Sequence, residues 1–348
     1  MASRWPEVLG RLVAREELNE EQAAWAMGEV LAGNATPAQV AGFAVALRAK
    51  GETVGEISAL AQSMLENATP IVLDREAVDI VGTGGDRART VNVSTMAAIV
   101  AAAAGAKVVK HGNRAASSSC GTADCLEALG VALDVPPERQ AAVLDQVGIV
   151  FLFAARYHPS LRHAAVARSE LGVPTTFNFL GPLANPARPL AQAVGVADVR
   201  MAPLLAGVLA GRGTRGLVFH GADGLDELTT TTTSRVWLMR DRRCVETSLD
   251  PVGLGLRAAR PEDLVGGDPA HNAQVVKDTF AGASGPVADI VVLNAAAALL
   301  AFHGPDLETD LAAQLDAWVS VARHAILSGA AGAKMDAWAA ASQAAAGR

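Results

Sequence analysis

Four polar segments of the sequence carry residue types that can bind phosphorylated ligands. The first, residues 82–86, is a glycine-rich turn (Gly-Thr-Gly-Gly-Asp) whose backbone N–H groups could approach an anion closely. It is not a dinucleotide fingerprint, because Arg87 stands where the G-x-G-x-x-G pattern needs a glycine, and it lacks the Gly-Lys-Ser/Thr of a P-loop. A tight strand-to-helix turn that binds nothing is the alternative for this segment.

The second segment, residues 92–95 (Asn-Val-Ser-Thr), directly precedes a long apolar run that is typical of a buried helix. Serine and threonine at a helix N-terminus are ordinary capping residues. The same hydroxyls, together with the free N–H groups of the first turn, could also bind a phosphate or a hydrated Mg²⁺. The segment alone leaves capping and ligand binding open.

The third segment runs from Lys110 to Ser118 and continues through residues 121–124. It brings two cations, a histidine, an asparagine and several hydroxyls into one loop that follows a predicted strand. A solvated loop does not require this combination, and we interpret the segment as a polyanion site.

The fourth segment, residues 223–227 (Asp-Gly-Leu-Asp-Glu), places the carboxylates of Asp226 and Glu227 next to each other. Adjacent carboxylates repel unless a cation lies between them, and Mg²⁺ held through waters and substrate oxygens is the natural candidate. An exposed acidic turn is the alternative. Because ligands of open α/β sheets bind at the carboxyl ends of the strands, the four segments together suit a substrate that carries a diphosphate group.

The elements that must position these segments alternate along most of the chain. Short runs of strand-forming residues precede glycine-rich or polar loops at 78–81, 107–109, 149–153 and 216–220. Helical patterns follow these loops, so we predict a mostly parallel sheet covered by helices on both faces. Two further runs, at 235–240 and 244–248, have no helix between them and suggest an antiparallel insertion.

Residues 1–70 show a different pattern, with apolar residues at helical spacing. Capping boxes are expected where Asn19, Thr36 and Thr53 are each followed three residues later by Gln or Glu. We therefore predict three or four short helices and then a linker at 67–70. A helix predicted at 159–171 could cover the sheet or return to pack with the N-terminal helices, and the pattern favours neither.

The composition limits the class of protein. A chain of 348 residues suggests about two domains, and a hydrophobic content of 51% excludes a disordered chain. The net charge of −7 disfavours nucleic-acid and anionic-membrane partners. The longest apolar run, residues 96–106, is too short to span a bilayer, and we expect no signal peptide. The three cysteines match no zinc spacing, so free thiols in a reducing cytoplasm are expected.

The polar segments occur in the order found in a known family. The chain resembles the anthranilate phosphoribosyltransferase family at residues 82–86, 92–95, 110–118, 121–124, 156–159, 177–183, 185–186 and 223–227. The resemblance covers essentially the whole chain and implies an α/β fold of the nucleoside phosphorylase/phosphoribosyltransferase type. It implies a small all-helical domain over 1–70, joined by 159–172, and a larger α/β domain with a mostly parallel central sheet over 73–348. A homodimer formed through the helical part is also implied.

The implied reaction transfers the phosphoribosyl group of 5-phosphoribosyl diphosphate (PRPP) to the amine of anthranilate, in tryptophan biosynthesis. The resemblance places Mg²⁺ at Ser94, Asp226 and Glu227. It places anthranilate at Gly82, Asn113 and Arg168. It implies PRPP contacts at Gly82, Gly85, Asp86, Thr90, Asn92, Val93, Ser94, Thr95, Lys110, His111, Gly112, Asn113, Arg114, Ala115, Ala116, Ser117, Ser118 and Thr122. No obligatory general base is expected, because an aromatic amine is neutral at pH 7 and has a free lone pair.

Two alternative functions remain open from the sequence. A pyrimidine nucleoside phosphorylase shares this type of fold and a lysine-containing loop, but it uses free phosphate and needs no paired carboxylates for Mg²⁺. A non-catalytic relative that binds nucleic acid would be expected to have a basic surface, which conflicts with the net charge of −7.

Overall fold

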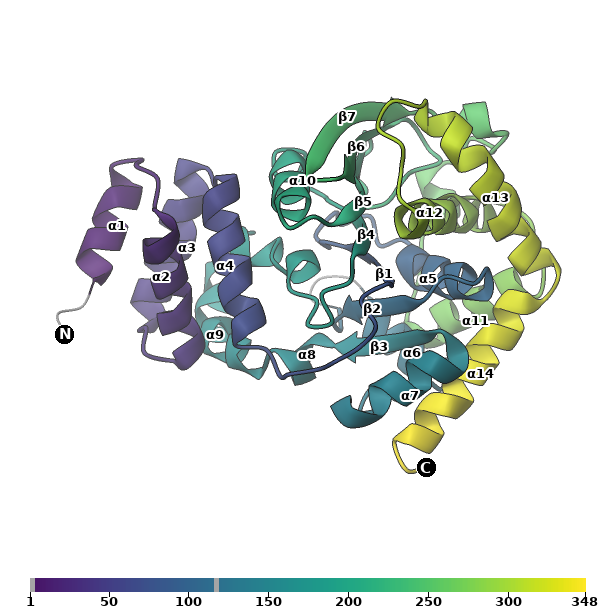
Figure 1. Ribbon diagram of the computed structural model, residues 1–348, viewed down its shortest axis with the longest axis horizontal. Helices are drawn as coiled ribbons and strands as arrows, with labels where there is room; N and C mark the ends of the chain where they lie inside the picture. The colour runs from purple at the N-terminus through teal and green to yellow at the C-terminus, as the bar shows by residue number, and fades with distance from the viewer. Residues whose placement is uncertain (1–3, 116–118) are drawn as a thin grey trace.

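The computed structural model describes residues 4–115 and 119–348. The expected PRPP contacts Ala116, Ser117 and Ser118 therefore lie outside the described residues. The chain folds into a helical bundle beside a larger body that is built on one sheet (Figure 1). This arrangement confirms the predicted fold class.

Four helices form the N-terminal part of the bundle: α1 (Trp5–Val13), α2 (Glu20–Ala32), α3 (Pro37–Lys50) and α4 (Val54–Glu66). All three predicted capping boxes are present, at Asn19, Thr36 and Thr53. In each box the cap side chain accepts a backbone N–H from the third helical residue, whose own side chain accepts the N–H of the cap. The starts of α2, α3 and α4 could therefore be predicted from the sequence, whereas α1 has no side-chain cap.

The sheet has seven strands in the order β3-β2-β1-β4-β5-β6-β7. The bounds are β1 (Val78–Gly82), β2 (Val108–Gly112), β3 (Ile149–Phe153), β4 (Ala191–Gly195), β5 (Arg215–Gly221), β6 (Ser234–Arg240) and β7 (Arg243–Leu249). The first five strands are parallel, and β6 and β7 extend the same sheet in antiparallel pairing. The chain runs outward from β1 to β3 and then crosses to β4 on the other side of β1. Ligands bind where strand order reverses in this way, so the carboxyl ends of β1 and β4 are the expected location of a site.

Strand β4 is missing from the sequence-based prediction. Its sequence, Ala-Gln-Ala-Val-Gly, contains a single β-branched residue, so no strand signal marks it. All five residues are nevertheless buried, and α12 packs on the strand. Small side chains suit a central strand that a helix approaches closely.

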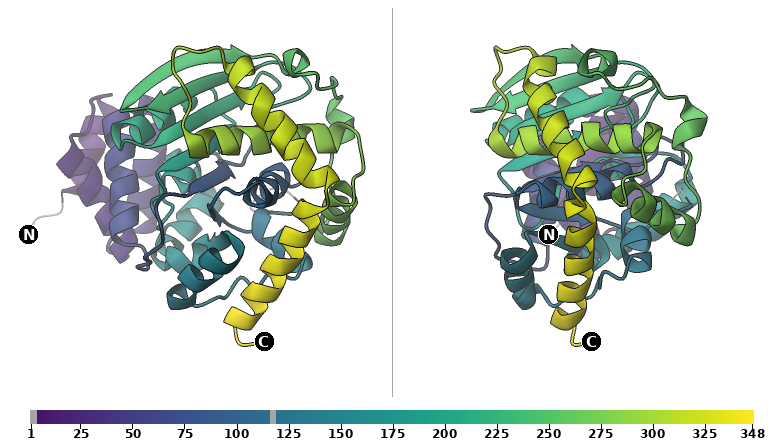
Figure 2. Two further views of the ribbon diagram at one scale, coloured as in Figure 1. Left: turned by 45° about the vertical axis from the view of Figure 1, so that its right-hand side comes forward. Right: turned by 90° about the vertical axis from the view of Figure 1, so that its right-hand side faces the viewer.

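The remaining helices complete the larger body and return once to the bundle. They are α5 (Val93–Ala103), α6 (Thr122–Ala128), α7 (Pro137–Val147), α8 (Ala154–Tyr157), α9 (Arg162–Leu171), α10 (Ala202–Gly211), α11 (Pro269–Phe280), α12 (Pro286–His303), α13 (Leu311–Leu327) and α14 (Ala330–Ala345). Helices α5 and α12 lie on one face of the sheet, and α13 and α14 cover them (Figure 2). On β5, Leu217 and Phe219 face this core, whereas Val218 faces a second core that continues through α10 into the bundle.

Helix α12 is the one helix among the described residues that is long and apolar enough to cross a membrane by length and composition. In this structure it is an interior helix. Its residues from Asp289 to Ala301 are all buried, between α5, α13 and the sheet.

Helix α9 packs against α2 and α3, and its residues Ala164 and Ala167 lie in the core of the bundle. Figure 1 shows the chain passing from β3 through α8 to this position. Of the two positions that the sequence left open, the helix therefore occupies the one beside the N-terminal helices.

Candidate active site

Two of the polar segments meet at the carboxyl ends of β1 and β4. Gly82 and Gly195 end these strands as register partners, and the loop that carries Asp226 crosses directly over both. A Cβ atom on Gly195 would lie 1.6 Å from the carbonyl oxygen of Asp226, and one on Gly82 would lie 2.1 Å from its Oδ2. The N–H of Gly84 donates to the same Oδ2 at 2.6 Å. Glycine is needed at both strand ends because any side chain would displace the acidic loop.

The acidic loop is held by one buried side chain from α12. Asn294 accepts the N–H of Leu228 at 3.0 Å and donates to its carbonyl oxygen at 2.9 Å. Within the loop, Asp223 accepts hydrogen bonds from the hydroxyls of Thr229, at 2.7 Å, and Thr231. Asp223 is therefore a structural residue of the loop, which leaves Asp226 and Glu227 for ligands. The sequence analysis missed Asn294. A single asparagine inside an otherwise apolar helical run could have indicated a buried polar contact.

Three carboxylates crowd together at this point. Burial raises the pKa of Asp226 to about 7, and the neighbouring carboxyl of Asp86 adds to the increase. Burial and the charge of Asp226 raise the pKa of Glu227 well above its ordinary value. Lys110 opposes the increase at Glu227 but does not cancel it. The site therefore has an excess of negative charge, which a divalent cation would relieve.

The donor atoms at this point suit Mg²⁺. Carboxylate and hydroxyl oxygens are the hard ligands that Mg²⁺ takes, and it usually keeps several waters or substrate oxygens as well. Asp226, Glu227 and the nearby Ser94 supply such oxygens. Within residues 4–115 and 119–348, no group of three or more His, Cys, Asp and Glu side chains could hold a metal ion by itself. Waters and oxygens of a bound ligand would have to complete the coordination.

Lys110 connects the carboxylates to the start of α5. Its side chain is almost completely buried, and Nζ donates to the carbonyl oxygen of Ile80 and to the hydroxyl of Ser94, at 3.2 Å for the latter. Burial lowers the pKa of Lys110, while Asp79 and Glu227 favour its charged form. A buried cation in this position can bind an anionic ligand at the carboxyl end of the sheet.

The capping interpretation of the second segment is wrong. The cap position of α5 is Asn92, and its side chain makes no capping hydrogen bond; it accepts from Asn272 at 2.8 Å instead. Ser94 and Thr95 lie inside the first turn. The Ser94 N–H donates to Glu227, and the buried Thr95 hydroxyl has no hydrogen-bond partner among the described residues. Without a side-chain cap, the positive end of this helix faces the site.

A second layer of buried polar groups lies behind Lys110, and the sequence analysis assigned no role in it to Asp79 or Asn185. Asp79 accepts the N–H of His111 at 3.2 Å and the Asn185 amide at 2.9 Å, and burial raises its pKa to about 6. Asn185 also donates to the carbonyl oxygen of Val109 at 2.8 Å. The signal for Asp79 was an acid inside the apolar strand Val-Asp-Ile-Val. These contacts fix the backbone of β2, which carries Lys110 and His111.

The ring of His111 lies against the ring of His158, with 5.3 Å between the centroids. Burial and this second histidine lower the pKa of His111 to about 3. A histidine in this state is neutral at physiological pH and is a weak proton acceptor.

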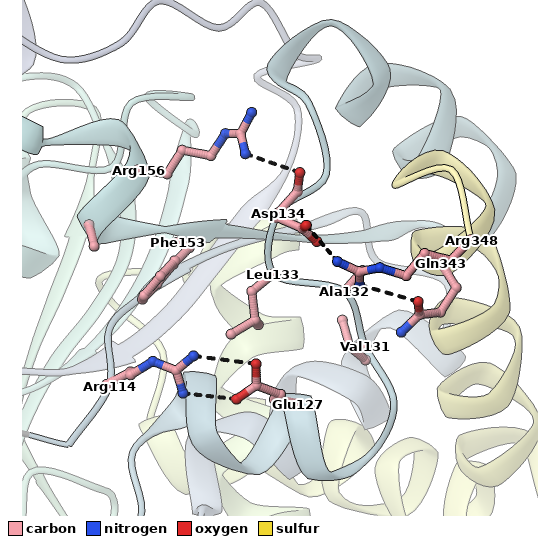
Figure 3. A pocket seen from close by; sticks show the side chains of 11 residues that line it. Arg114, Glu127, Val131, Ala132, Leu133, Asp134, Phe153, Arg156, Gln343 and Arg348 are labelled. Carbon is pink, nitrogen blue, oxygen red and sulfur yellow. Dashed lines mark hydrogen bonds and ion pairs between the residues drawn. The ribbon is translucent and has the colours of Figure 1, made fainter.

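The loop after β2 is folded by Asp124, which accepts the N–H groups of Ala115 and Gly121, each at 3.0 Å. Arg114 forms ion pairs with Asp124 at 2.8 Å and Glu127 at 2.9 Å. Figure 3 shows Arg114 facing Glu127 beside Phe153, at the edge of a cavity of about 510 Å³. The side chain of this expected PRPP contact is thus directed toward α6.

The other expected contacts of PRPP lie around the same edge of the sheet. Gly85 has a φ of 89° in the exposed turn after β1, and Thr90 forms an isolated bridge with Val265. Gly112 ends β2, Val93 begins α5, and Thr122 begins α6. Val93 and Gly112 thus lie within two residues of Ser94 and Lys110 in the chain.

Arg168 lies apart from the carboxylates, on α9. Its guanidinium is 5.9 Å from the centroid of the Phe177 ring, and burial lowers its pKa. No described residue forms an ion pair with it, and no hydrogen bond joins it to Gly82 or Asn113 within the described part of the chain. A half-buried cation without an acidic partner is available to a ligand carboxylate.

Comparisons with known proteins agree with this geometry. A model of the glycosyl transferase family, a/b domain, matches residues 74–332, and one of its helical bundle domain matches residues 6–68. A similar relative is the anthranilate phosphoribosyltransferase of Nocardioides sp., which is 59% identical over 97% of this chain and 99% of the relative. The anthranilate phosphoribosyltransferase of Acidothermus cellulolyticus is 57% identical over 99% of this chain and 96% of the relative. Among solved structures, the Thermus thermophilus enzyme is 42% identical, with a TM-score of 0.89, over 97% of this chain and 99% of that one. The Saccharomyces cerevisiae enzyme in complex with PRPP and Mg is 25% identical, with a TM-score of 0.88, over 99% of both.

The contact between β4 and the acidic loop can be tested with Gly195→Ala. The added Cβ would overlap the Asp226 carbonyl oxygen, so we expect the free energy of unfolding in urea to fall by about 1–3 kcal/mol. Gly211→Ala is the matched control, because nothing lies within 4 Å of a Cβ at that position. Equal stability of the two variants would contradict the close approach.

The burial of Asp226 predicts a pH dependence of stability. Its raised pKa means that the folded protein binds more protons than the unfolded chain between about pH 4 and about pH 7, so stability falls as pH rises through this range. Asp226→Asn removes this titration. We expect the variant to gain stability relative to the unsubstituted protein as the pH rises from about 4 to about 7, by roughly 1.4 kcal/mol for each unit of pKa increase.

This comparison requires urea unfolding in the presence of a chelator, so that no divalent cation is bound. The exposed Asp241→Asn is the control, because it also replaces one aspartate by asparagine. If the stability difference of Asp226→Asn varies with pH no more than that of the control, this carboxyl is not buried in a charged environment.

Proposed function

The chain belongs to the anthranilate phosphoribosyltransferase family, and we propose that the carboxylate-lined edge of its sheet binds PRPP with Mg²⁺. The reaction transfers the 5-phosphoribosyl group from PRPP to the amine of anthranilate. Its products are N-(5-phosphoribosyl)anthranilate and diphosphate, in tryptophan biosynthesis. The observation that carries the proposal is the excess of negative charge at the buried Asp226 and Glu227, with Asp86 beside them and the buried Lys110 opposing only part of it.

The diphosphate-bearing sugar would lie between the turn after β1, the first turn of α5 and the loop after β2. Lys110 and the N–H groups of the turn after β1 and of α5 supply positive charge there. Contact through the Arg114 guanidinium would require its ion pairs with Asp124 and Glu127 to open. The proposed PRPP contacts are Gly82, Gly85, Asp86, Thr90, Asn92, Val93, Ser94, Thr95, Lys110, His111, Gly112, Asn113, Arg114, Ala115, Ala116, Ser117, Ser118 and Thr122.

Mg²⁺ would be held by Ser94, Asp226 and Glu227, together with diphosphate oxygens. When bound, it offsets the negative charge that develops on the departing diphosphate. Lys110 and the backbone N–H groups bind the same leaving group and stabilise the same charge. These groups act on the difficult step, which is the loss of diphosphate from the sugar carbon.

The acceptor would lie with its carboxylate on Arg168, near Gly82 and Asn113. A guanidinium binds a carboxylate through two parallel hydrogen bonds, and the lack of an acidic partner for Arg168 among the described residues supports this role. Holding the amine over the anomeric carbon replaces a bimolecular encounter with a positioned reaction. The neutral amine needs no prior deprotonation, and the pKa of about 3 makes His111 a poor base. We therefore propose no obligatory general base.

Paired buried carboxylates favour this reaction over phosphorolysis of a pyrimidine nucleoside, because free phosphate needs no such pair. We also propose that the chain works in the cytoplasm as a homodimer formed through the bundle, without a nucleic-acid or membrane partner. The net charge of −7 supports the absence of a nucleic-acid or membrane partner, and cysteines that form no disulfide suit a reducing cytoplasm.

The metal role predicts the behaviour of a double variant, Asp226→Asn with Glu227→Gln. Each lost charged ligand weakens binding by about 1.5–3 kcal/mol, so the Mg²⁺ concentration for half-maximal rate should rise at least about tenfold. The measurement is the initial rate of formation of the fluorescent product as Mg²⁺ is varied. Glu262→Gln with Asp263→Asn, another adjacent acidic pair, is the matched control. An unchanged Mg²⁺ requirement in the first variant would reject the metal assignment.

The role of Arg168 predicts a selective defect. Arg168→Ala should raise the KM for anthranilate roughly 10- to 100-fold, as expected for loss of a charge-assisted hydrogen-bond pair, with a smaller effect on the KM for PRPP. Steady-state kinetics with each substrate varied in turn provide the test. Arg162→Ala, an exposed position on the same helix, should leave both constants near those of the unsubstituted enzyme. A larger effect on PRPP than on anthranilate would reverse the assignment.

A further inference from the structure

A second cavity, of about 200 Å³, lies at the opposite end of the strands from the candidate active site. Three arginines line it: Arg75 precedes β1, Arg188 precedes β4, and Arg212 lies between α10 and β5. Gln62 of α4 also lines it, so the cavity borders both the bundle and the sheet. Because the active-site loops follow the carboxyl ends of the same strands, the two sites are on opposite edges of the sheet.

The three arginines of this cavity have no acidic partners in the described ranges, since none of them forms an ion pair there. Arg75 donates to the carbonyl oxygen of Arg188 at 2.8 Å, and Nη1 of Arg212 donates to the carbonyl oxygen of Leu183 at 2.7 Å. The nearest acids in the sequence are engaged elsewhere, Asp74 with Lys107 and Glu76 with Arg215. The cavity therefore has an uncompensated positive charge.

Arg212 shows the electrostatic cost of this arrangement. Its Nη2 is buried and has no hydrogen-bond partner in the described part of the chain. Burial and, to a smaller extent, the charge of Arg188 together lower the pKa of Arg212 to about 10. A buried guanidinium that lacks one partner and is repelled by a neighbour would gain free energy from a bound anion.

The larger cavity in Figure 3 provides a contrast. Two of its three arginines, Arg114 and Arg348, form ion pairs with Glu127 and Asp134, at 2.9 Å and 2.6 Å. The third, Arg156, donates to the backbone carbonyl oxygen of Asp134 at 3.0 Å. Acids of the protein thus pair with two of the three charges there, whereas none of the three arginines at the amino ends of the strands forms an ion pair with a described residue.

The backbone at Arg188 is also unusual. Its φ is 49°, in the left-handed region that non-glycine residues adopt only at a cost of about 1–2 kcal/mol. Asn185 maintains this turn, accepting the N–H of Ala187 with its side chain and that of Arg188 with its carbonyl oxygen, each at 3.0 Å. The turn places Arg188 beside Arg212 despite their repulsion, which is understandable if a ligand lies between them.

We propose that Arg75, Arg188 and Arg212 form a binding site for a phosphate-type oxyanion, separate from the catalytic edge. Guanidinium groups present paired N–H donors that match the oxygens of phosphate. The volume accommodates a single small tetrahedral anion with a few waters. Because Arg75 belongs to the segment that joins the bundle to β1, the bound anion connects this segment to the loop before β4 and to the start of β5.

The test is equilibrium dialysis of the full chain with radiolabelled inorganic phosphate at constant ionic strength. Arg188→Gln and Arg212→Gln are compared with the unsubstituted protein and with Arg242→Gln. Arg242 is the matched control, because it donates to the carbonyl oxygen of Gly211, next to Arg212, but does not line the cavity. We expect Arg188→Gln and Arg212→Gln each to bind one phosphate fewer per chain than the unsubstituted protein, or to bind one of its phosphates at least tenfold more weakly.

None of the three substitutions lies at the catalytic edge, so any phosphate bound there contributes equally to the number measured for all four proteins. Competition by glycerol phosphate tells whether the cavity accepts an esterified phosphate as well as the free ion. Arg188 is exposed, so its variant keeps the test decisive if Arg212→Gln does not fold. The same number and affinity of bound phosphates in Arg188→Gln and Arg242→Gln would overturn the proposal.

Discussion

The repulsion between carboxylates at the ends of β1 and β4 is the constraint on which the rest of this structure depends. Burial and the neighbouring acids raise the pKa values of Asp226 and Glu227, and Lys110 compensates only part of the charge at Glu227. A protein interior does not keep such a group of acids without a partner, because each buried charge costs several kcal/mol unless it is paired. The missing positive charge matches what a divalent cation supplies, and diphosphate oxygens would complete its coordination.

The fold is arranged to hold that group in place. Two glycines end the neighbouring strands so that the acidic loop can cross above them, and Asn294 fixes the loop from the helix behind it. Asp79 and Asn185 fix the strand that carries Lys110. The bundle contributes Arg168 from a helix that leaves the sheet region and packs against α3. The proposed site thus draws on both parts of the chain, with the sheet region assigned to PRPP and the bundle to the acceptor.

The sequence predicted the features that depend on local chemistry. Capping boxes, turns and β-branched strands are specified by neighbouring residues, and the paired acids, Lys110 and the glycine-rich turn were visible as unusual combinations. Features that depend on long-range packing were not predictable. β4 carries no local strand signal, Asn294 acts on a loop far away in the sequence, and Arg114 is directed away from the site by acids on α6. The order of the strands, which brings the segments together, also follows from tertiary packing.

The most direct measurement is the anomalous diffraction of crystals grown with PRPP and with Mn²⁺ in place of Mg²⁺. The account predicts a metal peak at coordination distance from the carboxylates of Asp226 or Glu227, with diphosphate oxygens on its other side and Lys110 beside the leaving group. PRPP bound at another edge of the sheet, or a metal peak away from both carboxylates, would contradict it.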